Sequence, residues 1–158
     1  MTKVYDVPYM ERTRQYYRAQ GYTNDYQWAH YDATPFQLLA KPLAESKVGL
    51  ITTAMPDTEV GRETRAVYST PISPLPSSLY TAELSWHHGM THTNDVASLL
   101  PIEQLQALKS EGKIADIASE FHSAPTDYSK RNTLEHDAPE LLRRCKAQDV
   151  DIVLLVPL

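Results

Sequence analysis

Lys47-Val48-Gly49-Leu50-Ile51-Thr52-Thr53-Ala54 is the stretch that decides the fold. It is apolar nearly throughout and ends in small residues, which is typical of a strand buried on both faces of a sheet. Such strands occur in parallel sheets that helices cover on both sides. A second continuously apolar run closes the sequence. We therefore predict Val48–Thr53 and Ile152–Val156 as central, neighbouring strands of a mostly parallel sheet.

Helix and strand patterns alternate between these two strands. Pro101–Glu111 has proline in its first turn and Gly112 just beyond its end, as helices commonly do. Four prolines between residues 55 and 78 predict a long surface loop there, because proline removes a backbone donor. The other predicted elements are strands at Leu79–Trp86, Ile114–Phe121 and Asp151–Val156, and a helix at Asp137–Gln148 with Asp137 as its N-cap. This order predicts an α/β fold, a Rossmann-like three-layer domain.

The first 35 residues are crowded with tyrosines. Met10–Gln20 predicts a short helix that stops at Gly21, and no clean period follows it. We expect an aromatic-rich N-terminal arm (1–35) attached to a sheet core (36–158) within a single domain (1–158). So many aromatic rings are hard to bury inside one small sheet domain, and interfaces are enriched in tyrosine. The arm therefore predicts a homodimer or a contact with a partner subunit.

Composition narrows the class of protein. The 158 residues are 42% hydrophobic with a net charge of −5, and no basic face stands out, which argues against a nucleic-acid binder. The N-terminus lacks the apolar core of a signal peptide, and no apolar run approaches the ~20 residues that span a bilayer. A single cysteine, Cys145, cannot form an internal disulfide. We expect a cytoplasmic protein without membrane contact.

Histidines cluster in the second half of the chain. His88, His92 and Asp95 lie close together in the sequence, and His122 ends a predicted strand, where ligands bind in open α/β sheets. Imidazole ligates transition metals and titrates near neutral pH. We therefore predict catalytic roles for these four residues. His88, His92 and His122 are also the expected ligands of a divalent transition metal. An exposed loop with a chance excess of histidine explains the pattern as well.

Three further residues are candidates for binding a small substrate. Thr52 and Thr53 follow the strongest strand, and their hydroxyls with the turn amides suit a carboxylate or another small anion. Small residues that merely let the strand turn are the alternative. Tyr31 belongs to an aromatic segment that either reaches into a binding site or packs at an interface. Cys145 lies on the apolar face of a predicted helix, so we expect a buried and inert thiol.

Several blocks together resemble the selenoprotein-B family of glycine, sarcosine, betaine and D-proline reductases. Their order and spacing agree with the family over nearly the whole chain. The blocks are Tyr31–Phe36, Leu43–Ala54, Leu100–Leu108 with Glu111–Ile114, and Leu141–Pro157.

The resemblance implies an oxidoreductase-like fold and a small amino-acid-like or other polar substrate. The family cleaves a substrate C–N bond reductively with a selenocysteine or cysteine, placed just after the strand that ends like Val156-Pro157. The sequence stops at Leu158, so we expect the fold to carry over without the redox residue. Two alternatives stay open: a metal- or histidine-dependent lyase or hydrolase, and a non-catalytic small-molecule-binding or regulatory subunit.

Overall fold

The computed structural model describes residues 8–25, 30–35, 37–81, 94–127 and 129–157. The chain divides into two compact units, Met1–Gln37 and Leu38–Leu158. This division lies close to residue 35, where the sequence predicts the end of the arm.

The first unit contains one described helix, α1 (Tyr9–Ala19), close to the predicted Met10–Gln20. Gly21 follows with φ of 89°, the left-handed conformation expected after the helix. None of the residues of α1 is buried, and Tyr9 is 77% exposed. Within this unit the helix therefore has no apolar core of its own.

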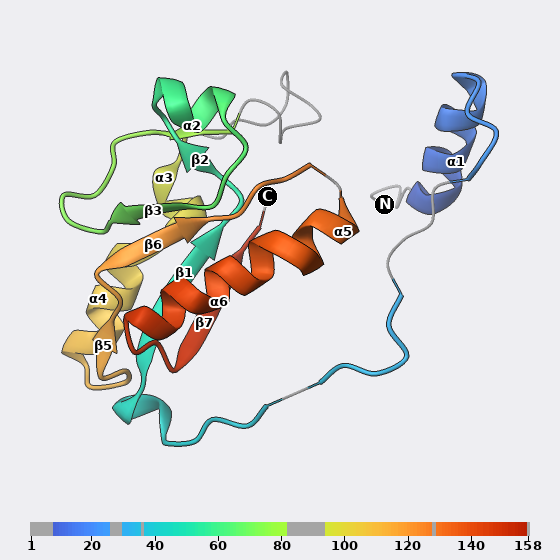
Figure 1. Cartoon of the computed structure of the whole chain (residues 1–158). Helices are drawn as coiled ribbons and strands as arrows, with labels where there is room; N and C mark the ends of the chain where they lie inside the picture. Colours follow the sequence, from blue (N-terminus) through green and yellow to red (C-terminus); the bar gives the residue numbers. More distant parts are fainter. Residues whose placement is uncertain (1–7, 26–29, 36, 82–93, 128, 158) are drawn as a thin grey trace, which may run out of the picture. The chain divides into compact units, whose positions relative to one another are not determined.

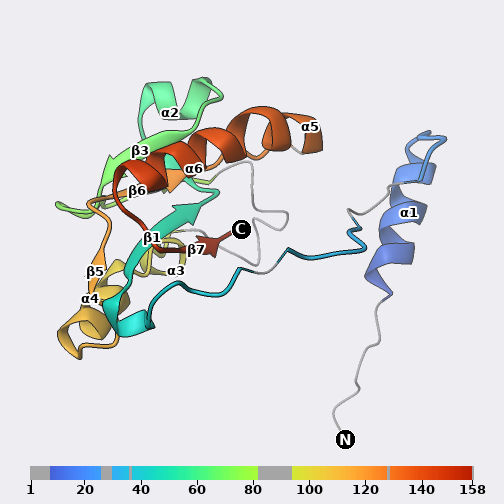
Figure 2. The same ribbon diagram turned by 60° about the horizontal axis from the view of Figure 1, so that its bottom comes forward.

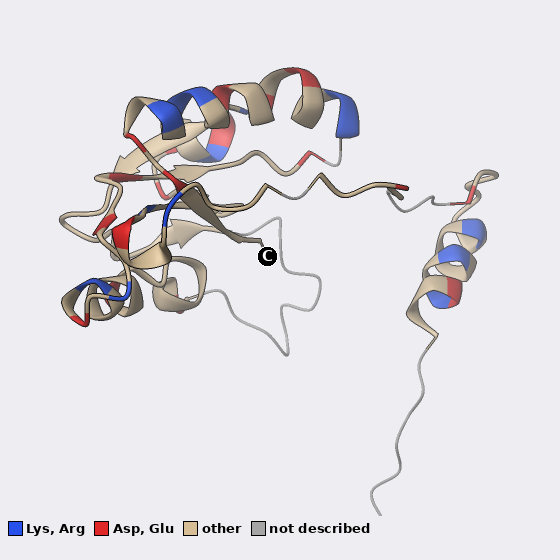
Figure 3. Cartoon of the chain, turned by 90° about the horizontal axis from the view of Figure 1, so that it is seen from below, with Lys and Arg blue, Asp and Glu red and all other residues tan. Residues whose placement is uncertain are grey.

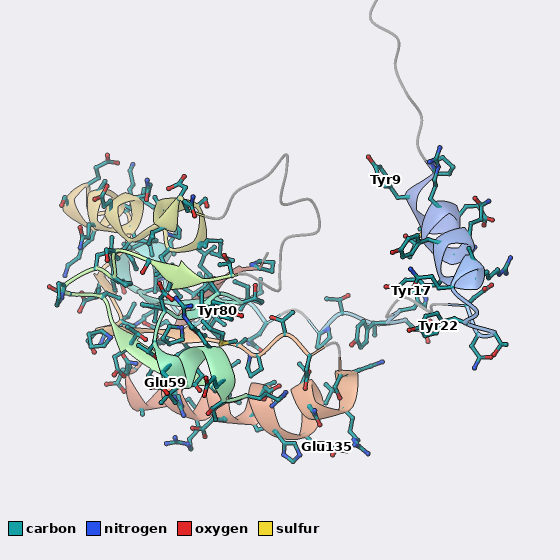
Figure 4. All side chains as sticks on the ribbon, turned by 90° about the horizontal axis from the view of Figure 1, so that it is seen from above. Tyr9, Tyr17, Tyr22, Glu59, Tyr80 and Glu135 are labelled. Atoms are coloured by element: carbon teal, nitrogen blue, oxygen red, sulfur yellow. The ribbon has the colours of Figure 1, made fainter. Side chains whose placement is uncertain are left out.

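Side-chain contacts hold the chain that follows α1 against its last turn. The rings of Tyr17 and Tyr22 meet edge to face, with centroids 5.5 Å apart, and Figure 4 shows them side by side. Arg18 donates from Nε to Oδ1 of Asp25 at 2.7 Å. These exposed contacts shape the turn.

In the second unit, β1 (Lys47–Thr52) is the middle of the main sheet (Figure 1). β7 (Ile152–Val156) pairs with it in parallel over nearly its full length. β5 (Asp116–Ile117) and β6 (Glu120–Ser123) pair in parallel with the beginning and end of β1, so they share its other side. β3 (Tyr68–Pro71) extends the sheet beyond β6 in the antiparallel direction. The prediction of an α/β fold with a mostly parallel sheet is confirmed.

The predicted pairing of the two apolar strands is confirmed, but the central position of the second is wrong. Among the described residues, β7 pairs only with β1, and Leu155 is 66% exposed. A continuous apolar run shows that a strand avoids water, but it does not show which neighbours cover it. β7 is therefore an edge strand of the described sheet.

Helices lie on both faces of the sheet, as Figure 2 shows. α6 (Ala138–Ala147) crosses one face, and α3 (Val96–Leu99) and α4 (Ile102–Ser110) lie against the other. α4 matches its prediction, and Gly112 beyond it has φ of 71°. The main apolar cluster lies on the α4 face and joins Val48, Leu50, Leu99, Leu100, Ile102, Leu105 and Phe121.

The long loop predicted between residues 55 and 78 is wrong in part, because the segment contains regular structure. β2 (Met55–Pro56) pairs in the antiparallel direction with β4 (Leu79–Tyr80), and α2 (Glu59–Glu63) follows β2. Thr58 caps α2 by accepting a hydrogen bond from the amide of Gly61 at 3.0 Å. The remainder of the strand predicted at Leu79–Trp86 lies outside the described residues after Thr81.

The chain before α6 is helical further back than we predicted. α5 (Lys130–Asn132) and the π-helical turn η2 (Thr133–Asp137) lead directly into α6. Asp137 is therefore not an N-cap: its backbone is helical and its side chain makes no capping bond. Pro139 lacks an amide hydrogen, which explains a widened turn just before it. Figure 3 shows charges of both signs along this helix.

Two glycines permit close backbone packing. A Cβ at Gly49 would lie 2.9 Å from Cγ1 of Val150, two residues before β7. A Cβ at Gly61 would overlap the carbonyl oxygen of Pro56. Both positions therefore exclude a larger residue unless a neighbour moves. No helix within the described ranges is long and apolar enough to cross a membrane.

Candidate functional site

The carboxyl ends of β1, β6 and β7 meet at one edge of the sheet. Thr52 stands in register with Ser123 of β6 on one side and with Val156 of β7 on the other. Ligands of open α/β sheets bind at the carboxyl ends of parallel strands. This edge is therefore where a site is expected.

Polar side chains are buried at this edge. Ser123 is 0% exposed, Thr52 1% and His122 2%. Threonine, serine and histidine seldom reach such burial, so each must be accounted for by its hydrogen bonds. Their side chains alternate along the strands. Thr52 and Ser123 face α4, whereas His122 faces α6.

His122 takes part in a chain of hydrogen bonds under α6. Its Nδ1 lies 2.9 Å from Oγ of Ser69 in β3, and Nη1 of Arg144 donates to the same Oγ at 2.9 Å. Arg144 also donates from Nε to Glu140 at 2.7 Å. A guanidinium can only donate, so Ser69 accepts from Arg144, and its hydroxyl can still either donate to Nδ1 of His122 or accept from it. Ser69 thereby joins the ring of His122 to Arg144.

The electrostatic surroundings of His122 favour the neutral form of its ring. Burial lowers the pKa of His122, and the nearby positive charge of Arg144 lowers it further. Arg143, and then Arg144, lower the pKa of Glu140 to about 2, so the carboxylate at the end of this series of hydrogen bonds stays ionised. In this setting His122 links β6, β3 and α6.

A second polar cluster joins three segments of the chain around Arg65. Arg65 donates through both terminal nitrogens to Asp137, at 3.1 and 2.6 Å, and through Nε to Asp127. Asp137 is only 4% exposed. Such a two-pronged pair fixes geometry as well as charge. Arg65 thus connects the turn before α6 with the loop that follows β6.

Asp127 organises that loop. It accepts hydrogen bonds from the side chain of Asn132 at 2.8 Å and from the amide of Ser129 at 3.1 Å, besides the bond from Arg65. Arg65, and then Asn132, hold the pKa of Asp127 far below its usual range. The carboxylate is therefore ionised near neutral pH, and its hydrogen bonds hold the loop.

The structure places the other predicted site residues as follows. Asp95 is the N-cap of α3, where it accepts from the amide of Ala97 at 3.1 Å. Thr53 follows β1 and is half-buried. Tyr31 belongs to the first unit and is 59% exposed.

His88 and His92 lie outside the described residues, so their predicted meeting with His122 stays a prediction. Within the described ranges, no group of three or more His, Cys, Asp or Glu side chains could hold a metal ion.

Cys145 is the buried residue of α6 and is 5% exposed. Burial raises the pKa of its thiol. A protonated thiol out of reach of solvent is a poor nucleophile, so the structure agrees with an inert Cys145.

Ser123 is the important residue that our sequence reasoning missed. It directly follows His122, just beyond the predicted strand Ile114–Phe121, so continuing the alternation of that strand places it on the face opposite to His122. A serine at a core position was thus a readable signal. Arg65 gave none, because its partners Asp127 and Asp137 are far along the sequence.

Comparison with known proteins gives no relative. No protein-family model matches the chain, and neither a curated protein nor a solved structure does.

Proposed function

We propose that this chain is a substrate-binding relative or subunit of the glycine, sarcosine, betaine and D-proline reductase group. It holds a small amino-acid-like molecule at the carboxyl edge of β1 and β6 in a Rossmann-like, cytoplasmic domain. The sequence blocks quoted above support the family, and the mostly parallel sheet with helices on both faces is compatible with it.

One observation carries the proposal. Thr52 and Ser123, 1% and 0% exposed, stand in register where two parallel strands end. Burying a hydroxyl without a hydrogen-bond partner is unfavourable, so these two residues add little stability to the fold through their hydroxyls. Their position at the carboxyl ends of the strands suits them to hold a polar molecule. Cys145 has no redox role in this proposal.

Titration with glycine, sarcosine, betaine and D-proline tests it, with L-proline as the matched control. We expect at least one of the four to bind at millimolar concentration and to shift the amide resonances of residues 52–54 and 123–126. L-proline should bind more weakly than D-proline if the edge distinguishes the hands of the ligand. The proposal fails if none of the four shifts these resonances.

A further inference from the structure

Thr52 and Ser123 are neighbours on the α4 face of the sheet. They are paired in the parallel register of β1 and β6, and residues paired in this way point to the same face. Adjacent strands lie about 4.8 Å apart. Val48 and Leu50, which alternate with Gly49 and Ile51 along β1, belong to the apolar cluster with α4, and Thr52 continues their series. Two hydroxyls thus stand side by side at the end of an apolar face.

Neither hydroxyl proton has an acceptor among the described residues. Oγ1 of Thr52 accepts a hydrogen bond from the amide of Ala54 at 3.3 Å, so one of its lone pairs is used while its proton is not. Oγ of Ser123 is buried without any hydrogen-bond partner in the described part of the chain. A buried hydroxyl nearly always has a partner, and each exception needs an explanation.

The partner that the hydroxyl protons of Thr52 and Ser123 lack is a hydrogen-bond acceptor. Both hydroxyls have a proton to donate, and an oxygen placed between two donors on adjacent strands can accept from both. A carboxylate offers two acceptor oxygens and a carbonyl offers one with two lone pairs. An ammonium group offers only donors, so it would leave both hydroxyl protons without an acceptor.

Thr126 supports a ligand at this place. Its Oγ1, in the loop after β6, is also buried without a partner among the described residues. The next residue, Asp127, is fixed by Arg65, Asn132 and the amide of Ser129. A third unused hydroxyl therefore lies in a firmly held loop beside the same strand end.

We propose that Thr52 and Ser123 form a pair of hydroxyl donors that holds the carboxylate or carbonyl oxygen of the ligand. The inference rests on the proposed function and deepens it, since it names the atoms of this chain that bind and the group of the ligand that they bind.

Acetate, acetamide and methylammonium test the pair, because the three probes are all small and differ in their hydrogen-bonding groups. We expect acetate or acetamide to shift the amide resonances of Ala54 and Ala124, and methylammonium to leave them in place. Tighter binding of acetate identifies a carboxylate site. Equal binding of acetate and acetamide identifies a carbonyl-oxygen site.

Thr52→Val and Ser123→Ala each remove one donor with little change in shape. Each should weaken binding of the preferred probe about tenfold, the effect of one lost hydrogen bond to a charged or strongly polar group. Ser46→Ala is the matched control at the opposite edge of the sheet: Ser46 is also 0% exposed, and its Oγ donates to the carbonyl of Pro42 at 3.0 Å. It should leave probe binding unchanged.

Stability without any probe gives an independent readout. Ser46→Ala loses a hydrogen bond and should lower the urea midpoint, whereas Ser123→Ala loses none and should leave the midpoint unchanged or raise it. A midpoint lowered equally by both, with no probe bound to the native protein, means that an internal water satisfies Ser123, and the hydroxyl pair is then wrong.

The two proposals fail in different ways. One outcome is that one of the four amino-acid ligands shifts the amide resonances of residues 52–54 and 123–126 to the same extent in the native protein and in both variants, Thr52→Val and Ser123→Ala. In that case the edge binds the ligand, but the two hydroxyls do not contribute to binding. Binding of methylammonium in preference to acetate and acetamide also overturns the pair.

Discussion

At the scale of single residues, the surroundings of His122 favour the neutral form of its ring. Arg144 can only donate to Ser69, and the same serine oxygen lies at hydrogen-bond distance from Nδ1 of His122. The ring is 2% exposed and stands near a guanidinium. A second proton on this ring would therefore be disfavoured by burial and by the nearby positive charge of Arg144.

Stability should therefore fall when the pH drops below about 6.5. The folded-state pKa of His122 is lowered from its usual 6.5, so the unfolded chain takes up the proton first. The contribution of the neutral ring is complete above the unfolded pKa and is lost as the pH falls through the folded pKa. Inside that window the free energy of unfolding should decrease by up to about 1.4 kcal/mol per pH unit, as measured by urea unfolding.

His122→Asn keeps an acceptor near Ser69 but cannot be protonated in this range, so its pH profile should be flatter. His136→Asn, at an exposed residue of η2, is the control and should keep the native profile. A native profile that stays unchanged in His122→Asn would show that another group causes the acid loss.

At the scale of elements, Arg65 ties together segments that the sheet does not connect. It lies between α2 and β3, and its partners lie in the loop after β6 and in η2. Since these contacts are polar and point in fixed directions, they position the loop rather than merely bury it.

Arg65→Lys should loosen that loop. Lysine keeps the charge but lacks the planar fork, so it cannot bind both oxygens of Asp137 and also reach Asp127. The largely buried Asp137 then loses a hydrogen bond, and the free energy of unfolding should drop by about 1–3 kcal/mol. Hydrogen exchange should also speed up at the amide of Ser129, which depends on Asp127, while the amides of β1 stay protected.

Arg62→Lys is the control, because Arg62 of α2 forms an exposed pair with Asp57, which precedes the helix. It should change little, as exposed pairs usually do. Equal effects of the two substitutions would mean that Arg65 acts as an ordinary surface charge.

The elements that were predicted well are those whose sequence carries its own signal. β1 and α4 have continuous or periodic apolar residues with clear ends, so their positions followed from the chain alone. The positions of elements in the segment from 55 to 78 did not, because Pro56 and Pro71 stand at the ends of β2 and β3 and leave room for these strands and for α2. Asp137 was predicted as an N-cap because its actual partner, Arg65, is too distant in the sequence to be identified from it.

The residues of the candidate site were likewise predictable only in part. Thr52 followed from its place after a buried strand. Ser123 needed the register that sets β6 beside β1, and register is a long-range property. The role of His122 depends on Ser69 and Arg144, which come from other elements.

At the scale of the whole molecule, we expect a dimer that depends on the N-terminal arm. Within the first unit α1 buries none of its residues, and Tyr9, Tyr16 and Tyr22 are each more than half exposed. Aromatic residues that remain exposed on one short segment are typical of an interface. Light scattering of the full chain should give a dimer, and the variant lacking residues 1–30 should give a monomer.

A matched control separates the tyrosines from the loss of chain. Tyr9→Ser with Tyr16→Ser removes two exposed rings that add nothing to a described core, so folding should be kept while the dimer weakens. A full-length protein that is monomeric at micromolar concentration would contradict the prediction.

The two close-packed glycines will constrain how this sequence can change in evolution. A side chain at Gly49 collides with the side chain of Val150, so alanine at 49 becomes acceptable when a smaller residue arises at 150. The two positions should then vary together. Gly61 collides with the backbone of Pro56, and no substitution elsewhere removes a carbonyl oxygen. Position 61 should therefore stay glycine in every descendant that keeps α2 where it is.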